Sequence, residues 1–162
     1  MKNIRNFKTF ENLWSESDAT LYDPFDMIRY KQIDQLKSYI KRNRNLDILN
    51  NYGETLLFVV CERELSSIVD LMIEYGADIN KLNENKIGTH TLMTPLHVAA
   101  YMNNLSIMIS LIDNGAIWEI KNYLNFDFLQ MCNTKIKNTI ISLYPEKYKE
   151  YLRNNAAKDF NI

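Results

Sequence analysis

Glycine, proline, histidine and cysteine are scarce in this sequence: among 162 residues there are four, three, two and two of them. The sequence contains no phosphate-binding loop, no glycine-rich dinucleotide motif, no zinc-protease motif and no cysteine–histidine cluster with zinc spacing. No combination of its histidine, serine, cysteine and acidic residues suggests a nucleophile–base pair. We therefore expect a protein that is not an enzyme and that binds no cofactor or metal.

An excess of charge of one sign is also missing, because 19 lysine and arginine residues are balanced by 20 acidic residues to give a net charge of −1. Such a chain lacks the basic field that non-specific nucleic-acid binding requires. The longest apolar run, residues 56–61, is far too short to cross a bilayer. No apolar run follows Lys2, Arg5 and Lys8 to make a signal peptide. We expect a cytoplasmic protein that binds neither nucleic acid nor membranes.

The most informative stretch begins at Thr94, whose hydroxyl can cap a helix by accepting a hydrogen bond from an amide of its first turn. Pro95 suits the first helical position, where its missing N–H costs nothing. A short apolar helix is expected over 96–100, and apolar residues at helical spacing predict a second helix over 105–112. Gly115 then stands where a helix usually ends in a left-handed residue.

This order of cap, short helix, turn, longer helix and glycine resembles an ankyrin repeat. The Thr-Pro-Leu-His motif at 94–97, followed by Ala100, is the most specific part of the resemblance. One such repeat cannot bury its own apolar face, so neighbours are expected at a period of about 33 residues.

Both neighbours of this repeat can be found in the sequence. Thr55 and Gly76 correspond to Thr94 and Gly115 at an offset of one period plus six positions. Asp127 lies one full period after Thr94 and is again a residue type that caps helices.

A further repeat is indicated near the N-terminus. Asn43 lies one full period before Gly76, and asparagine is the usual substitute for glycine in the left-handed conformation. Asp23-Pro24-Phe25 reads like Thr-Pro-Leu, and Asp23 precedes Thr55 by one position less than a period. We therefore expect a helix to begin after Asp23 and Asn43 to have a positive φ.

The resemblance implies an all-α ankyrin-repeat solenoid of about four helix-turn-helix repeats, with short β-hairpin fingers and terminal capping helices. The expected repeats cover 22–52, 53–83, 92–122 and 125–144, between an N-terminal capping segment at 1–21 and a C-terminal capping helix and tail at 145–162. The last helix is predicted from Pro145 and from a stripe of apolar residues at helical spacing, which is more typical of a core than of a ligand site. The stripe consists of Tyr144, Tyr148, Tyr151 and Leu152.

Three chemically reactive side chains receive structural roles in this register. Cys61 and Cys132 fall at core positions of the first helices of their repeats, which predicts buried, reduced thiols. The resemblance implies that His97 forms hydrogen bonds that tie the loops of adjacent repeats together.

One finger is longer than the family pattern. The segment between Asn80 and Thr94 is six positions longer than the pattern allows, so the finger at 81–93 contains an insertion. Insertions in repeat proteins map to loops, often on the binding face. A loop insertion is also tolerated at little cost, so a neutral insertion remains an equal alternative.

The resemblance implies that the chain binds a specific protein partner through a concave face built from the fingers and the exposed side of the first helices. Tyrosine, methionine and arginine, which are enriched in interface cores, are common at those positions. The candidate contact residues are Arg29, Tyr30, Tyr52, Glu62, Arg63, Glu84, Asn85, Lys86, His90, Tyr101, Met102 and Tyr123.

Two specific roles are left open by the sequence. The chain could be an immunity or inhibitor protein that neutralises a cognate toxin or enzyme, or a pathogen or viral effector or adaptor that recruits its partner. In either role we expect a monomer in isolation.

Overall fold

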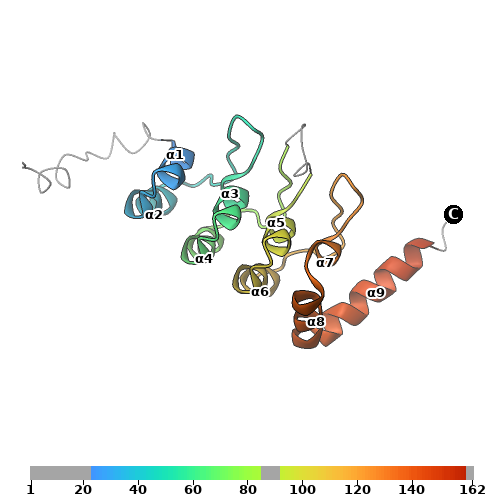
Figure 1. Ribbon diagram of the computed structural model, residues 1–162. Helices are drawn as coiled ribbons and strands as arrows, with labels where there is room; N and C mark the ends of the chain where they lie inside the picture. Colours follow the sequence, from blue (N-terminus) through green and yellow to red (C-terminus); the bar gives the residue numbers. More distant parts are fainter. Residues whose placement is uncertain (1–22, 85–91, 160–162) are drawn as a thin grey trace, which may run out of the picture.

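The computed structural model describes residues 23–84 and 92–159, and this part of the chain is all-α (Figure 1). The first helices of the pairs form an inner layer and the second helices an outer layer, and α9 follows the last pair. The inner helices are α1 (Pro24–Arg29), α3 (Leu56–Glu62), α5 (Pro95–Tyr101) and α7 (Phe128–Met131). The outer helices are α2 (Ile33–Arg42), α4 (Ser66–Glu74), α6 (Leu105–Asp113) and α8 (Thr134–Leu143), and α9 is Pro145–Asp159.

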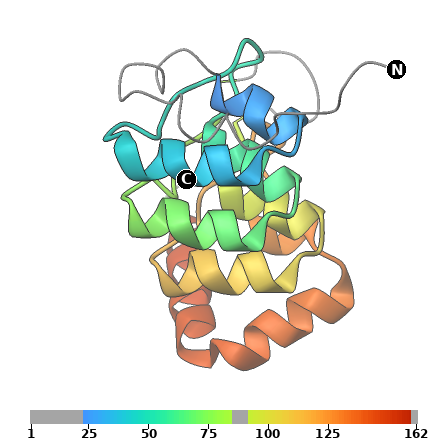
Figure 2. The ribbon, with the colours of Figure 1, turned by 90° about the vertical axis from the view of Figure 1, so that its left-hand side faces the viewer.

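The expected repeat solenoid is therefore confirmed. Each inner helix packs against the next inner helix, and α2, α4 and α6 lie roughly parallel to one another along the array (Figure 2). One loop connects each of α2, α4 and α6 to the inner helix that follows it. We call these loops the first finger (43–55), the second finger (75–94) and the third finger (114–127). The β-hairpin character expected of the fingers is not confirmed, since their described residues contain one isolated bridge, between Leu49 and Thr55, and no strand.

All four inner helices begin in the same way. Asp23, Thr55, Thr94 and Asp127 are N-cap residues, and the side chain of each accepts a hydrogen bond from an amide in the first turn. At Thr94 and Asp127 the cap is reciprocal, because the residue three positions later bonds back to the amide of the cap. The caps predicted from the sequence are thus confirmed in each helix pair.

The stops of the outer helices follow the prediction at two of three places. Gly76 and Gly115 have φ of +83° and +96°, as expected of glycines that end helices. The prediction for Asn43 is wrong, because its φ is −100° and its backbone is extended. Asn43 instead ends α2 through its side-chain amide, which donates to the carbonyl of Tyr39 at 2.7 Å, so no left-handed residue is needed.

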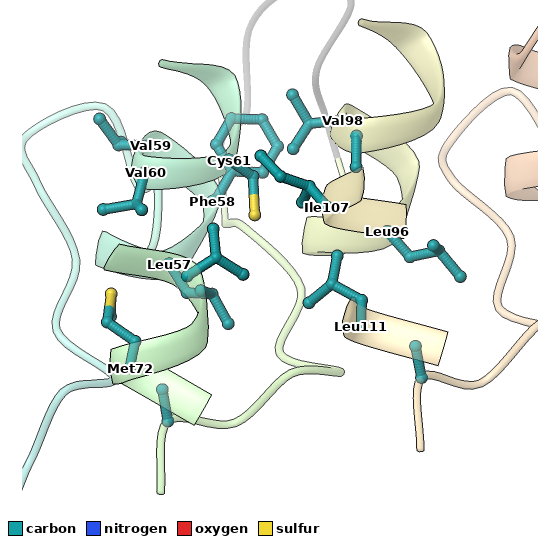
Figure 3. Close-up of a cluster of buried hydrophobic side chains, with 14 of the residues drawn as sticks. Leu57, Phe58, Val59, Val60, Cys61, Met72, Leu96, Val98, Ile107 and Leu111 are labelled. Atoms are coloured by element: carbon teal, nitrogen blue, oxygen red, sulfur yellow. The ribbon is translucent and has the colours of Figure 1, made fainter. Parts of the chain in front are cut away.

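The core is one continuous cluster of buried apolar side chains that runs through the helix pairs. Figure 3 shows Phe58 and Cys61 of α3 facing Val98 and Ile107 of the next pair. Cys61 is fully buried and free, as predicted, and burial raises the pKa of its thiol.

The prediction that Cys132 occupies a buried core position of an inner helix is wrong. Cys132 is free but only half-buried, and its backbone is extended at the end of α7. It lies outside the core of an inner helix because α7 is a single turn that already ends at Met131.

The helix α9 begins at Pro145, as expected, and packs on the last helix pair. Tyr144, Tyr148 and Tyr151 lie against the core, but the prediction for Leu152 is wrong, because this side chain is 47% exposed. Among the described helices, none has the length and apolar character needed to cross a bilayer.

His97 ties two adjacent repeats together, as the resemblance implied. Its Nδ1 lies 2.7 Å from Oγ1 of Thr94, and its Nε2 lies 3.1 Å from the carbonyl oxygen of Phe126 in the third finger. Because a carbonyl can only accept, Nε2 carries the proton and Nδ1 is the acceptor in neutral His97. Burial lowers the pKa of this imidazole and keeps it neutral.

The stop at Gly115 leads to the first prediction. A Cβ added to Gly115 would meet no atom within 4 Å, so the cost of a substitution comes from the positive φ alone. Gly115→Val should lower the free energy of unfolding by more than about 1 kcal/mol, because a β-branched residue is strained in this region. Gly115→Asn should cost less, and equal urea midpoints for the two variants would contradict the assigned helix stop.

The buried imidazole of His97 leads to a prediction about pH. The unfolded chain takes up a proton near pH 6.5, whereas the lowered pKa keeps the folded protein neutral to a lower pH. The unfolded state therefore binds more protons below about pH 6.5, and stability is lost as the pH falls. His97→Gln removes this pH-dependent loss of stability. In urea unfolding, the difference in free energy of unfolding between the original protein and the variant should therefore be largest at pH 7 and smaller at pH 5. A difference that is the same at both values would show that His97 does not titrate on unfolding.

Candidate functional site

Six of the twelve candidate contact residues lie at the C-terminal ends of three inner helices. Arg29, Glu62 and Tyr101 are the last residues of α1, α3 and α5. The following C-cap residues are Tyr30, Arg63 and Met102. Because the inner helices pack side by side, their ends follow one another along the array, and we call these six residues the helix-end row.

The helix-end row has the same backbone shape in each of the three repeats that form it. Its C-cap residues are followed by Lys31, Glu64 and Asn103, whose φ values are +57°, +56° and +55°. Positive φ is uncommon for residues other than glycine, so a common turn is maintained at some cost in strain. The side chains of the row are consequently presented from equivalent positions.

The charges of the helix-end row are paired locally. Arg29 lies 3.1 Å from Asp26, and Nε of Arg63 lies 4.0 Å from Glu62. Both arginine side chains are 64% exposed, and such surface ion pairs contribute little to stability. The arginines can therefore exchange these partners for others without a large loss of folding free energy.

Tyrosine supplies the most exposed aromatic surface of the site. Tyr30 and Tyr101 in the helix-end row are 67% and 56% exposed. Tyr52 in the first finger and Tyr123 in the third are 69% and 46% exposed. Two of the three helix ends, and the tips of the first and third fingers, thus each carry an exposed tyrosine.

An asparagine closes the tip of the first and third fingers. The Oδ1 of Asn50 accepts from the amides of Tyr52 and Glu54 at 2.9 and 3.0 Å. The Oδ1 of Asn122 accepts from the amides of Leu124 and Phe126, both at 3.0 Å. Each tip is therefore a short turn closed by one side chain.

The second finger is closed in the same way over a longer span. The Oδ1 of buried Asn83 accepts from the amide of Met93 at 2.7 Å, and the amide of Asn83 donates to the carbonyl of Met93 at 3.0 Å. Ten positions separate these two residues, against four in the other fingers. The insertion is consequently confined to the tip, beyond a closure that the other fingers share.

Sequence analysis missed these closures although a signal was available. An asparagine stands five positions before the caps Thr55 and Asp127, and Asn83 stands eleven positions before Thr94, which is five plus the six inserted ones. This spacing would have located the insertion at the tip of the second finger.

The candidate residues of the second finger are only partly described. Glu84 is exposed, and its amide donates to the carbonyl of Gly53 in the first finger at 2.6 Å. The predictions for Asn85, Lys86 and His90 lie outside the described residues.

Several exposed apolar side chains of the fingers were not among the candidates. Leu124, Phe126 and Leu92 are 49%, 44% and 43% exposed. Tyr101 is four positions after His97 and so lies on the same side of α5, the side that bonds the third finger at Phe126. Tyr101 and the third finger therefore lie on the same side of α5.

The closure by Asn83 leads to a prediction about the long finger. Deleting positions 85–90 makes the tip between Asn83 and Leu92 as short as those of the other fingers, and Leu92 already has the positive φ of their fourth position. The shortened protein should keep its helicity and its melting temperature within a few degrees, because loop length contributes little to stability. Asn83→Ala should instead destabilise by roughly 1–3 kcal/mol, since it leaves a buried amide of Met93 without an acceptor. Thermal unfolding followed by circular dichroism separates the two, and a deletion as harmful as Asn83→Ala would make the long tip structural.

Comparison with known proteins agrees with this architecture. The sequence model of a family described as ankyrin repeats (three copies) matches residues 25–122, and the pair α7–α8 lies beyond that match. The chain is 26% identical over 143 residues to Ankyrin repeat protein B18 of Vaccinia virus (strain Ankara), which covers 78% of the chain and 23% of that protein. It is 28% identical over 102 residues to Putative ankyrin repeat protein L371 of Acanthamoeba polyphaga mimivirus, which covers 63% and 13%.

A third relative is Inactive serine/threonine-protein kinase TEX14 of Bos taurus, which is 32% identical over 84 residues, or 50% of the chain and 5% of that protein. The chain thus spans less than a quarter of the length of each of these three relatives. The family match covers well over half of the chain and coincides with the first three helix pairs. The chain belongs to the ankyrin repeat family.

Proposed function

We propose that the chain is a non-catalytic module that binds another protein through the helix-end row and the finger tips. The single observation that carries this proposal is the set of four exposed tyrosines, Tyr30, Tyr52, Tyr101 and Tyr123, on the helix ends and fingers. Tyrosine provides a large, rigid contact area at a low cost in conformational entropy. Side chains this exposed bury little apolar surface within the fold, and recognition of a protein surface would bury more of it.

The remaining candidates complete this surface in the proposal. Arg29, Glu62, Arg63 and Met102 surround the tyrosines of the helix-end row, and Glu84, Asn85, Lys86 and His90 extend it along the second finger. Arginine adds bidentate hydrogen bonds and methionine an adaptable apolar contact, and both are typical of interface cores. The module is proposed to be a monomer without its partner and to bind neither nucleic acid nor membranes.

Of the two specific roles, the comparisons favour an effector or adaptor. Two of the three relatives above are viral ankyrin repeat proteins, and their names state no partner. Because the chain spans only a small part of each relative, we propose the adaptor role for this module without transferring any activity of a whole relative. The immunity or inhibitor role has no comparable support.

The helix-end row leads to a prediction about binding. Tyr101→Ala combined with Arg63→Ala should change the melting temperature by no more than a few degrees, because both side chains are largely exposed. Affinity for the partner should fall by about 2 kcal/mol or more, roughly thirtyfold in Kd, if the row contains interface hot spots. The partner would be purified from the source cell on the tagged chain, identified, and titrated as a pure protein by calorimetry.

A matched control for this experiment is Tyr75→Ala. Tyr75 is 39% exposed and is the C-cap residue of the outer helix α4, so it lies at the base of the second finger and belongs neither to a finger tip nor to the helix-end row. Its removal should leave affinity unchanged. If Tyr75→Ala weakens binding and the double variant does not, the outer layer is the binding face and the proposed surface is wrong.

A further inference from the structure

The first two fingers are each held by the repeat that follows. The Oδ1 of Asp47 accepts from the amide of Asp78, and the Oδ1 of Asn80 accepts from the amide of Ile117, both at 2.9 Å. Asp47 and Asn80 occupy equivalent positions, one repeat period apart. A side chain near the base of each finger thus accepts from the backbone of the next finger.

The third finger has no following finger among the described residues, and α9 takes that place. Glu119 is the equivalent of Asn80, one period plus the six inserted positions later. Its Oε1 accepts from the side-chain amide of Asn154 in α9 at 2.8 Å. The position that holds one finger to the next repeat therefore holds the third finger to the C-terminal helix.

A second tie connects α9 to the end of the third finger. Asp127 is completely buried and caps α7, and its Oδ2 accepts from the hydroxyl of Tyr151 at 2.7 Å and from Nζ of Lys121 at 2.5 Å. A buried carboxylate depends on such partners. A helix of one turn, such as α7, has little stability of its own. Tyr151 therefore supports both the cap of α7 and, through Lys121, the finger that leads to it.

Aromatic packing joins the same two segments. The ring of Trp118, near the start of the third finger, lies 5.1 Å from Phe128, 6.2 Å from Tyr144 and 6.1 Å from Tyr151 between centroids. The first two pairs are edge-to-face, a favourable geometry for aromatic rings. Trp118, Glu119 and Lys121 are thus all held, directly or through Asp127, by α9 and its preceding residue.

We infer that α9 sets the conformation of the third finger, and that Tyr151 is the positioning residue that couples them. The finger presents Tyr123, Leu124 and Phe126, so docking of α9 governs the display of these side chains while the first finger stays unaffected. The consequence for partner binding rests on the proposed function. The coupling itself does not, because it is a property of the isolated chain.

Amide hydrogen exchange of the full chain tests this inference in the variant Tyr151→Phe. The change removes only the hydroxyl that donates to Asp127 and keeps the ring. The amides of Asn122 and Phe126, which bond within the third finger, should exchange about tenfold faster, equivalent to ~1.4 kcal/mol for a hydrogen bond to a charged group. The matching amides of Asn50 and Glu54 in the first finger should keep their rates.

Two further variants sharpen the result. Tyr148→Phe is the matched control, because Tyr148 stacks on Tyr151 at 6.0 Å on the same helix, and it should leave the third finger unchanged. Asn154→Ala removes the separate tie to Glu119 and should accelerate exchange in the third finger in the same direction as Tyr151→Phe. Unchanged rates at Asn122 and Phe126 in both Tyr151→Phe and Asn154→Ala would overturn the coupling.

Equal acceleration in the first and third fingers would overturn it as well, since that result means general destabilisation. The experiment contains no partner, so its outcome is independent of the proposed function. If the Tyr101 and Arg63 double variant binds the partner as tightly as the original protein, the proposed binding surface is wrong. The coupling between α9 and the third finger is not affected by that result.

Discussion

A helix pair of this array cannot bury its apolar side by itself and must pack it against a neighbouring element, and the rest of the structure depends on that constraint. In α3, which has a neighbour on each side, all residues from Leu56 to Cys61 are buried. The middle of α3 is thus used for stacking and has no exposed side chain for recognition. What remains available is the end of each inner helix and the finger that precedes it, where Tyr101 and Tyr52 are exposed.

Features set by a few neighbouring residues could be predicted from the sequence. The cap at Thr94 and the stop at Gly115 follow from local hydrogen bonding and from the φ that glycine tolerates, and both are present in the structure. Asn43 shows the limit of such reasoning. The same residue type can end a helix through its side chain instead of its backbone, and only the surrounding contacts decide between the two.

The surface was harder to predict, because exposure depends on what covers a residue. The register assigned Tyr123 to it but gave no reason to include Leu124 or Phe126, which the turn closed by Asn122 holds at the surface. The candidate contacts in the tip of the second finger remain predictions. The prediction that Leu152 belongs to the core was wrong for a related reason. A stripe at helical spacing shows which residues share a face of α9, but how much of that face is buried depends on the helices against which it packs.

The C-terminal end of the array differs from its interior in one further respect. Among the described side chains, Nε1 of Trp118 is a buried polar atom with no hydrogen-bond partner, and it lies where α9 meets the third finger. Leaving such a donor unpaired costs roughly 1–3 kcal/mol, which the aromatic contacts and the bond from Tyr151 to Asp127 must offset. Between α3 and α5, by contrast, apolar side chains such as Phe58 and Val98 meet with no unpaired polar side-chain atom among the described residues. Because the stacking of α3 on α5 has no such unpaired donor, we expect α9 to separate before the interior helices, taking the support of the third finger with it.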